Sequence, residues 1–386
     1  MAQLNALVIG AGFAGATVAR KLAEGGKHVL VVERRDHIGG NAYDCYDAEG
    51  VLIHKYGPHI FHTGHKEVYD FLSRFTLWRE YDHRVVANVY GQLMPVPFNL
   101  TSLDIALEEQ AAPVAEKLLA AYGPERKVTI LELRQSNDPE LSALADYVYE
   151  NIFKVYTMKQ WGQTPEEIDP ATTARVPVFL SRDDRYFQDL YQGMPLEGYT
   201  PLFEKLLDHP NIQLRLSTDA GEVLTLTQVG TTLVDGHPFH GPIIYTGAVD
   251  DLFERRFGRL PYRTLDFVFE THNVEWYQTH GTVNYTVDQP FTRITEFKHL
   301  TGQTLPKKTT IMKEFSKAYT GEDGQIPYYA IINPENKALY GQYAALAAQY
   351  PNLYLLGRLA EYQYYNMDAI VKRALDLSGE LLAAKN

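Results

Sequence analysis

The 386-residue sequence predicts an α/β fold in which a discontinuous parallel sheet carries two insertions, a helical bundle and an antiparallel sheet. Three observations support this fold class. The chain begins with an apolar run, a glycine-rich turn, a helical pattern and a second apolar run. A strand–turn–helix pattern returns near the C-terminus, and between the two ends helical patterning precedes β-type alternation. We therefore expect the two ends of the chain to close one sheet.

The first forty residues have the pattern of a Rossmann-like dinucleotide-binding unit. Apolar residues 7–9 form a strand, and Gly10-x-Gly12-x-x-Gly15 opens a helix. Gly10 permits the turn, Gly12 lets the backbone approach a pyrophosphate, and Gly15 lets helix and strand pack closely. The second apolar run ends in Glu33, at the place where an acid roughly 20 residues on binds an adenosine ribose. The helix N-terminus supplies N–H groups to the pyrophosphate.

Flanking residues favour FAD over NAD as the dinucleotide. Glu33 is followed by Arg34 and then by Gly39-Gly40-Asn41, and this glycine doublet after the acid resembles the flavoprotein class. Near the C-terminus stands "NLYLLGRLAEYQYYNMDAIVKRALDLSGELL", an apolar strand, a turn at Arg358 and a helix that we expect Asn366 to cap. The apolar face of this helix is expected to consist of Ile370, Val371, Ala374 and Leu375. Flavoproteins of this kind return the last helix to the cofactor domain, so the sequence predicts a discontinuous FAD-binding domain.

The segments between these two ends define the expected domains. Residues 100–170 are patterned as helices, with a helix start at Asp138-Pro139-Glu140, and residues 262–332 alternate as in an antiparallel sheet. Residues 211–247 return to strands, and the last of them, in "PIIYTGAVDDLF", is expected to bring the chain back to the first sheet. The expected boundaries are residues 1–77, 205–258 and 336–386 for the FAD-binding domain, 99–180 for a helical substrate domain, and 78–98, 181–204 and 259–335 for the antiparallel sheet domain.

Composition limits the partners. The net charge of −12 argues against nucleic acid, because its field repels polyanions. No apolar run is long enough to span a membrane and no basic-then-apolar leader is seen, so we expect a cytoplasmic protein without membrane insertion. The single cysteine, Cys45, excludes an internal disulfide and is interpreted as a buried spectator.

Motifs of hydrolases and metal sites are missing, and no metal is expected. Adjacent acids, such as Asp250-Asp251, lie in polar sequence that is typical of solvated loops. Individually, Tyr156 and Trp161 are typical of a helix-bundle core, and Arg293 could pair with Glu296. Together, the arginines and tyrosines suit a nucleotide diphosphate, since arginine makes charge-assisted hydrogen bonds to its oxygens and tyrosine hydroxyls donate without adding charge.

Six stretches resemble the bacterial UDP-galactopyranose mutase family over essentially the whole chain: "VIGAGFAGATVARKL", "VVERRDHIGGNAYD", "YGPHIFHT", "VYTMKQWG", "FTRITEFKH" and "GRLAEYQYYNMDAI". The resemblance implies interconversion of UDP-galactopyranose and UDP-galactofuranose, a cell-wall precursor, without net redox change. It implies that FAD acts only when reduced, with its N5 as nucleophile on the anomeric carbon and NAD(P)H as electron source. A homodimer is also implied.

The resemblance assigns roles to residues of this chain. Arg175 matches a mobile-loop arginine that closes over the substrate diphosphate, and Arg293 matches the second diphosphate arginine. Arg358 and His62 match residues beside the flavin. These four residues are the implied catalytic residues. The other implied substrate-binding residues are Tyr156, which stacks on uracil, its neighbours Thr157 and Trp161, the phosphate donors Tyr186, Tyr329 and Tyr364, and Asn284 and His83. The implied cofactor-binding residues are Gly10, Gly12, Phe13, Gly15, Glu33, Arg34, Gly40, Asn41, His59, Ile60, Arg358, Asn366 and Met367. Many members have aspartate at Asn366 and asparagine at His83, so we expect altered substrate affinity.

Two rival functions share the cofactor fingerprint. A flavin-dependent amine or porphyrinogen oxidase would need an apolar substrate tunnel and would not need several arginines and tyrosines around one pocket. A FAD protein that only binds nucleotide sugars would keep the pocket without turnover.

Overall fold

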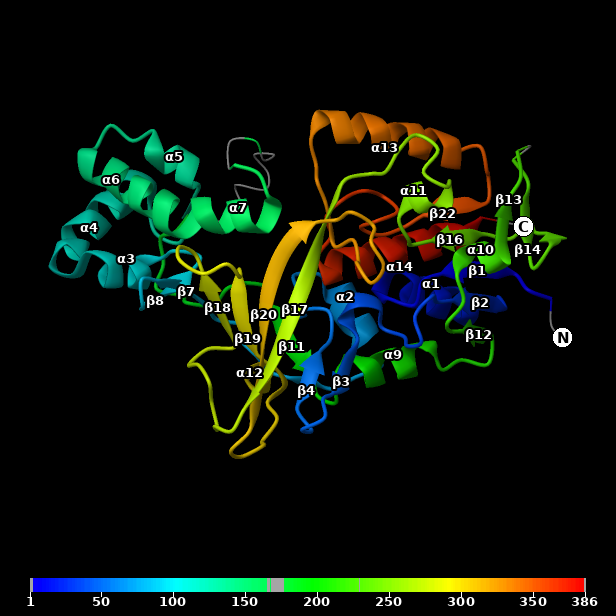
Figure 1. Cartoon of the computed structure of the whole chain (residues 1–386), viewed down its shortest axis with the longest axis horizontal. Helices are drawn as coiled ribbons and strands as arrows, with labels where there is room; N and C mark the ends of the chain where they lie inside the picture. The colour runs from blue at the N-terminus through cyan, green and yellow to red at the C-terminus, as the bar shows by residue number, and fades with distance from the viewer. Residues whose placement is uncertain (1–2, 165–166, 168–176, 229, 385–386) are drawn as a thin grey trace.

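The computed structural model describes residues 3–164, 167, 177–228 and 230–384. In Figure 1, the helices between α3 (Leu100–Leu107) and α7 (Val155–Trp161) lie at one end of the long axis. A parallel sheet lies at the other end, and the long strands β17 (Tyr262–His272) and β20 (Thr309–Ala318) stand between them. The mixed α/β architecture agrees with the predicted fold class.

The parallel sheet is built from segments that are far apart in the sequence. Within the described ranges it has five strands in the order β12-β2-β1-β16-β22, and every neighbouring pair is parallel. The strands are β1 (Ala6–Ile9), β2 (Val29–Val32), β12 (Ile212–Arg215), β16 (Ile243–Tyr245) and β22 (Leu353–Leu355). The expectation that both chain ends and the 243–245 run share one sheet is confirmed.

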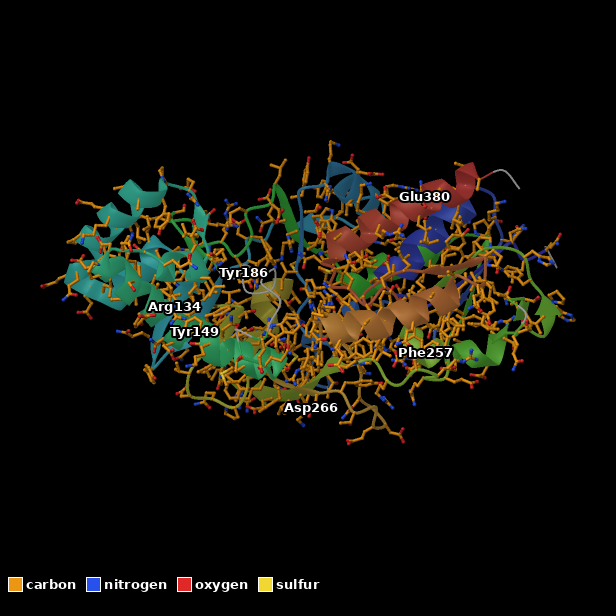
Figure 2. All side chains as sticks on the ribbon, turned by 90° about the horizontal axis from the view of Figure 1, so that it is seen from above. Arg134, Tyr149, Tyr186, Phe257, Asp266 and Glu380 are labelled. Atoms are coloured by element: carbon orange, nitrogen blue, oxygen red, sulfur yellow. The ribbon has the colours of Figure 1, made fainter. Side chains whose placement is uncertain are left out.

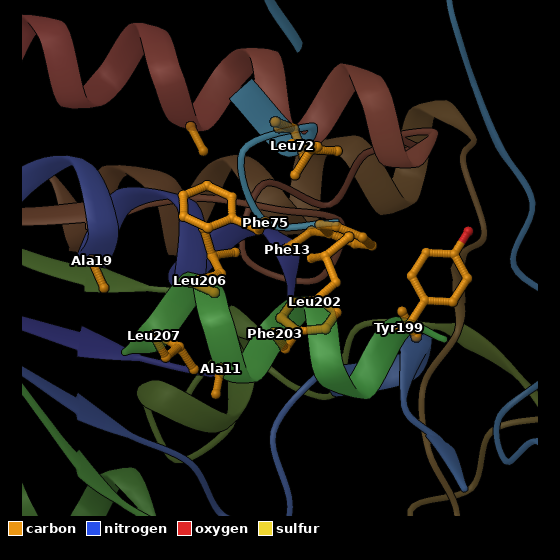
Figure 3. Close-up of a cluster of buried hydrophobic side chains, with 14 of the residues drawn as sticks. Ala11, Phe13, Ala19, Leu72, Phe75, Tyr199, Leu202, Phe203, Leu206 and Leu207 are labelled. Carbon is orange, nitrogen blue, oxygen red and sulfur yellow. The ribbon is translucent and has the colours of Figure 1, made fainter. Parts of the chain in front are cut away.

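Both faces of this sheet are covered, which explains why β1 and β2 are continuous apolar runs. Ala6 and Val8 face a core formed with α1 (Phe13–Glu24), α9 (Tyr199–Leu207) and α14 (Met367–Ala383). Figure 3 shows the aromatic centre of this core, where Phe203 of α9 lies next to Phe13, with ring centroids 4.7 Å apart. Leu7 and Ile9 face the opposite core, which includes α13 (Pro334–Ala347).

The last helix buries the face that its pattern predicts. Val371 and Ala374 are fully buried, and α14 runs against α1. Asn366 occupies the N-cap position as expected, but its side chain makes no capping hydrogen bond. The predicted cap is therefore correct in position and wrong in mechanism.

The second large sheet is mixed. Its order over the described residues is β21-β17-β20-β19-β18-β7-β8, with all pairs antiparallel except β18 and β7. The strands not yet given are β7 (Val85–Val89), β8 (Gln92–Val96), β18 (Thr282–Tyr285), β19 (Arg293–Glu296) and β21 (Tyr329–Ala330). The β18–β7 pair is parallel because the two strands come from distant segments of the chain and are not joined by a hairpin. The residue pattern within β7 does not reveal this pairing.

The helix predicted to start at Asp138-Pro139-Glu140 is α6 (Pro139–Val148). Asp138 caps α6 by accepting hydrogen bonds from the N–H groups of Glu140 and Leu141. A π-helix, η3 (Tyr149–Lys154), then leads into α7, and Arg134 lies 4.1 Å from the centre of the Tyr149 ring (Figure 2). The other described helices between α3 and α7 are η2 (Glu108–Gln110), α4 (Ala111–Tyr122) and α5 (Ile130–Arg134).

Smaller elements complete the described chain: η1 (Gly40–Ala42), β3 (Asp44–Tyr46), β4 (Leu52–His54), β5 (Phe61–Thr63), α2 (Lys66–Leu72), β6 (Trp78–Arg79), β9 (Lys127–Val128), β10 (Val178–Phe179), β11 (Tyr191–Pro195), α10 (Ala220–Val223), β13 (Leu224–Leu226), β14 (Thr232–Val234), β15 (His237–Pro238), α11 (Val249–Leu252) and α12 (Phe297–Thr301). Among the helices in the described ranges, none is long and apolar enough to cross a bilayer.

Candidate active site

A cavity of about 730 Å³ opens at the carboxyl ends of the parallel strands. Segments from both chain ends and from the middle of the sequence line it. Ligands of open parallel sheets bind at this edge, where the loops leave the strands. The cavity therefore lies where the glycine motif predicts a dinucleotide.

Close backbone contacts explain the glycines of the motif. Gly10 has φ +108°, and a Cβ on Gly15 would lie 1.9 Å from the Gly10 carbonyl oxygen. A Cβ on Gly40 would lie 2.9 Å from the Cα of Gly12. The missing side chain at Gly15 therefore lets α1 pack against β1, and the missing side chain at Gly40 leaves room for a pyrophosphate beside Gly12 and the helix N-terminus.

Glu33 and Arg35, which follow β2, hold the glycine-rich loop in place. Glu33 is buried and its two carboxylate oxygens accept hydrogen bonds from the N–H groups of Ala11 and Arg35, at 2.9 and 3.0 Å. Arg35 donates through Nη2 to Asn41 Oδ1 at 2.8 Å, whereas its buried Nη1 has no hydrogen-bond partner in the described part of the chain. A buried cationic donor without a partner at this cavity suits an anionic cofactor, so the residues present fit FAD.

Ten of the thirteen predicted cofactor residues line the cavity: Gly10, Gly12, Phe13, Glu33, Arg34, Gly40, Asn41, His59, Arg358 and Met367. Gly15, Ile60 and Asn366 are not among the lining residues. Gly15 instead permits the contact between α1 and β1, Ile60 packs against the core, and Asn366 precedes Met367 at the start of α14.

His59 enters the cavity as a neutral imidazole. Its Nδ1 lies 2.9 Å from the Gly57 carbonyl oxygen, which places the proton on that nitrogen. Burial lowers the pKa of His59 to about 3, so the ring stays uncharged at neutral pH.

Sequence reasoning missed a third set of lining residues, which the middle of the chain supplies: Thr218, Asp219, Leu224, Tyr245, Thr246 and Gly247. Thr246 and Gly247 directly follow β16. Since the carboxyl ends of parallel strands meet at one edge, the predicted 243–245 strand was the signal that could have found them.

Arg358 connects this cavity to a cluster of tyrosines. The residue lines the cavity, and its Nε donates to the Tyr365 carbonyl oxygen at 2.6 Å. Its guanidinium lies 4.4 Å from the ring centre of Tyr364 and 5.7 Å from that of Tyr329. The rings of Tyr364 and Tyr329 are nearly parallel, with centroids 6.1 Å apart. The cofactor cavity and the predicted substrate residues are thus contiguous.

Arg293 is held by a carboxylate on the next strand. Its Nη2 lies 3.3 Å from Glu314 Oε1, and Glu314 is only 2% exposed. Burial opposes the charge, but the Glu314 carboxylate raises the pKa of Arg293 above its ordinary value. The alternative partner Glu296 is wrong, because β19 and β20 place Arg293 opposite Glu314. The Nε of Arg293 is buried without a hydrogen-bond partner among the described residues.

The neighbouring tyrosines stay protonated. Burial raises the pKa of Tyr156 and of Tyr329 above the ordinary value, although the charge of Arg293 opposes this rise. Both hydroxyls therefore remain hydrogen-bond donors at neutral pH. Trp161, at the end of α7, has its ring centroid 5.7 Å from that of Tyr329.

Tyr186, His83, Phe187 and His62 form a second group of contacting aromatic side chains. Tyr186 lies near the middle of the long axis (Figure 2), and its N–H donates to the His83 carbonyl oxygen at 2.7 Å. His83 is 4% exposed, and burial lowers its pKa to about 3. The Phe187 ring lies between the two histidines, with centroids 6.0 Å from His83 and 3.5 Å from His62.

Thr157, Asn284 and Arg175 are the remaining predicted substrate residues. Thr157 and Asn284 are buried, and Oδ1 of Asn284 has no hydrogen-bond partner within the described ranges. Arg175 lies outside the described residues. Cationic groups, protonated hydroxyls and flat rings thus surround one region beside the cavity, a combination that suits a nucleoside diphosphate.

Known proteins resemble this chain in sequence and in fold. The profile of the UDP-galactopyranose mutase family matches residues 151–364, and that of the NAD(P)-binding Rossmann-like domain matches residues 8–75. A dTDP-fucopyranose mutase of Escherichia coli is 37% identical, with 96% of each chain covered. A UDP-galactopyranose mutase of Mycoplasma pneumoniae is 36% identical over 98% of this chain and 96% of its own.

Among solved structures, a reduced UDP-galactopyranose mutase superposes with a TM-score of 0.71 and 15% identity, over 100% of this chain and 95% of the other. At that identity the superposition shows the fold alone. The family match extends over more than half of the sequence, and the two relatives extend over nearly all of it. The chain therefore belongs to the UDP-galactopyranose mutase family of isomerases.

Proposed function

We propose that the protein interconverts UDP-galactopyranose and UDP-galactofuranose, using FAD and without net redox change. The observation that carries the proposal is the position of Arg358. It lines the cavity that fits FAD and also contacts Tyr364 and Tyr329, which continue toward Arg293. A nucleotide sugar held by this cluster has its sugar end beside the cofactor.

The cofactor proposal assigns separate tasks to the two ends of the chain. The turn at Gly12 and the N-terminus of α1 receive the pyrophosphate, and Glu33 and Arg35 stand where the adenosine half would lie. When bound and reduced, FAD supplies a nucleophilic nitrogen, N5, for attack on an anomeric carbon. We propose NAD(P)H as the source of its electrons.

The cluster residues bind and orient the nucleotide in this proposal. Arg293 and Arg358 neutralise the diphosphate, and the hydroxyls of Tyr186, Tyr329 and Tyr364 donate to its oxygens. The charges of the two arginines and the hydroxyl donors of the tyrosines hold the diphosphate after the anomeric bond breaks, so that it can be recaptured. The base is assigned to Tyr156, Thr157 and Trp161, and closure over the diphosphate to Arg175.

A second substrate is favoured by one comparison. The Escherichia coli relative at 37% identity is a dTDP-fucopyranose mutase, which acts on a 6-deoxy sugar attached to a thymine nucleotide. The same ring contraction and the same diphosphate recognition would serve either substrate. The two candidates differ at the sugar 6-position, the base methyl group and the ribose 2′-position.

An anaerobic assay tests the activity and the substrate together. Protein reduced with dithionite is incubated separately with UDP-galactofuranose and with dTDP-fucofuranose, and pyranose formation is followed by chromatography. We expect conversion by the reduced protein only, with the UDP sugar as the better substrate. Faster conversion of the dTDP sugar would assign the second candidate. Peroxide formation from an amine, with neither sugar converted, would indicate the oxidase, and binding of the UDP sugar without conversion would indicate a carrier.

We further propose a homodimeric, cytoplasmic protein that binds neither nucleic acid nor membrane. The net charge of −12 supports the absence of polyanion partners. Light scattering coupled to size-exclusion chromatography measures the assembly, and a mass equal to that of one chain at micromolar concentration would contradict the dimer. The three-domain division with the boundaries given above stays a prediction.

A further inference from the structure

Asp189 forms a short contact with His62. Its Oδ2 lies 2.8 Å from Nδ1 of the imidazole, and the His62 ring is stacked on Phe187, with ring planes 12° apart. The His62 side chain is 12% exposed and that of Asp189 is 35% exposed. One ring face and one ring nitrogen of His62 are therefore fixed by the same short segment.

That segment is itself held by the strand pair that carries His62. Gln192 lies opposite His62 in the pairing of β11 with β5. Its Nε2 donates to the carbonyl oxygens of Phe187 and Asp189, each at 3.0 Å. The positions of Phe187 and Asp189 are thus tied to that of His62, and the contact is not a chance meeting of two mobile side chains.

The contact decides which nitrogen of His62 carries the proton. A carboxylate accepts hydrogen bonds, so Nδ1 must donate, and in the neutral ring Nε2 is left as an acceptor. Nε2 has no hydrogen-bond partner among the residues that the structure describes. We propose that Asp189 is a positioning residue that holds His62 in the Nδ1-protonated form, so that Nε2 accepts a hydrogen bond from a hydroxyl of the bound sugar.

The location of His62 supports a sugar hydroxyl as the donor. His62 is not among the residues that line the cofactor cavity. It adjoins His83 through Phe187, and the charge of Arg293 acts on His83. Phe187 also contacts Tyr186, which is assigned to the diphosphate, with ring centroids 4.9 Å apart. The inference rests on the proposed function for the identity of the ligand, but the tautomer of His62 depends on the protein alone.

The tautomer is measured by long-range proton–nitrogen NMR of protein labelled at histidine, with the His62 signals assigned by their loss in His62→Asn. We expect Nδ1 protonation in the wild type. Asp189→Ala should move His62 toward the Nε2-protonated form, and Asp189→Asn should give a mixture, because its amide can either accept or donate. Nε2 protonation in the wild type, or an unchanged spectrum in Asp189→Ala, would overturn the proposal.

Binding and turnover test the hydroxyl contact. In Asp189→Ala we expect kcat/KM for UDP-galactofuranose to fall roughly tenfold or more, the loss of one hydrogen bond, while the Kd for UDP alone changes less than about twofold. Adding Asp189→Ala to His62→Ala should cause little further loss, because Asp189 acts through His62. The inference would be contradicted if Asp189→Ala weakened UDP binding as much as it lowered kcat/KM. It would also be contradicted if the effects of Asp189→Ala and His62→Ala on kcat/KM were fully additive.

The matched control is Asp70→Asn, which removes an exposed carboxylate paired with Lys66 on α2. It should change neither the His62 signals nor turnover. If the wild-type protein converts neither sugar, the proposed function fails by itself, and the tautomer measurement still decides the role of Asp189.

Discussion

At the scale of single residues, Arg293 shows how a buried cation is kept charged and available. Glu314 on the adjacent strand balances its charge, while Nε remains without a partner within the described chain. Arg293→Lys should retain the charge beside Glu314 but lose the planar pair of donors. We expect kcat/KM to fall roughly 10- to 100-fold, equivalent to one charge-assisted hydrogen bond of about 1.5–3 kcal/mol, with flavin content unchanged.

Steady-state kinetics and the flavin absorbance of the purified variant measure these two effects. Arg182→Lys is the control, because that arginine is exposed and pairs with Asp104. Loss of flavin together with activity in Arg293→Lys would mean that Arg293 serves the cofactor and not the substrate.

His54 predicts a pH dependence of stability. It is fully buried, its Nδ1 accepts the N–H of His59 at 3.0 Å, and burial lowers its pKa from 6.5 to about 4. The unfolded chain therefore binds more protons between these values, and stability is lost as the pH falls from 6.5 toward 4. From pH 7 to pH 5 this residue should cost about 2 kcal/mol of unfolding free energy.

Urea unfolding at the two pH values tests this prediction with His54→Asn, whose amide oxygen can replace the acceptor. The stability difference between wild type and His54→Asn should shrink by about 2 kcal/mol as the pH falls. His237→Asn, at an exposed position on β15, is the control. If the stability difference between wild type and His54→Asn does not change with pH, burial does not lower the pKa of His54.

At the scale of elements, the contact of β1 with α1 decides whether a cofactor can bind. Gly15→Ala places a methyl group 1.9 Å from the Gly10 carbonyl oxygen, so the helix must move away from the glycine turn. We expect loss of bound flavin, measured by absorbance. Gly379→Ala in α14 has no atom within 4 Å of the new methyl group and should keep its flavin. Full flavin content in Gly15→Ala would remove the turn from the proposed cofactor site.

Element-scale predictions from sequence succeed where local chemistry dominates. The Asp138 cap and the buried face of α14 follow from neighbouring residues and helical spacing, and both are confirmed. Asp250 shows the limit. Its polar neighbours suggested a solvated loop, but it is 2% exposed and accepts the N–H of Leu260 at 3.0 Å. Its partner Leu260 lies ten residues away in the sequence, and the composition around Asp250 does not predict that contact.

At the scale of the whole molecule, the FAD cavity is shared by segments from both ends and from the middle of the chain. A ligand bound there stabilises the fold by mass action, by about 2.7 kcal/mol at a hundredfold excess over its Kd. Removing flavin should therefore lower the thermal midpoint by several degrees, and adding FAD back should restore it. Calorimetry of the two forms measures the shift. An equal midpoint with and without flavin would place the cofactor elsewhere.

By itself, the sequence determined the fold class, the nucleotide-binding turn and the family, because these depend on short motifs whose chemistry is local. Gly10, Gly12 and Glu33 could be assigned from spacing alone, and the structure brings all three to one cavity. The binding roles of the substrate residues stay predictions.

Only the tertiary structure decided which side chains meet. The pairing of Arg293 with Glu314 depends on strand register, and the contact of His62 with Asp189 joins residues that are 127 positions apart. The lining contributed by Thr246 depends on which strands share an edge. Long-range contacts of this kind arise from packing several elements at once, and no pattern within one element contains them.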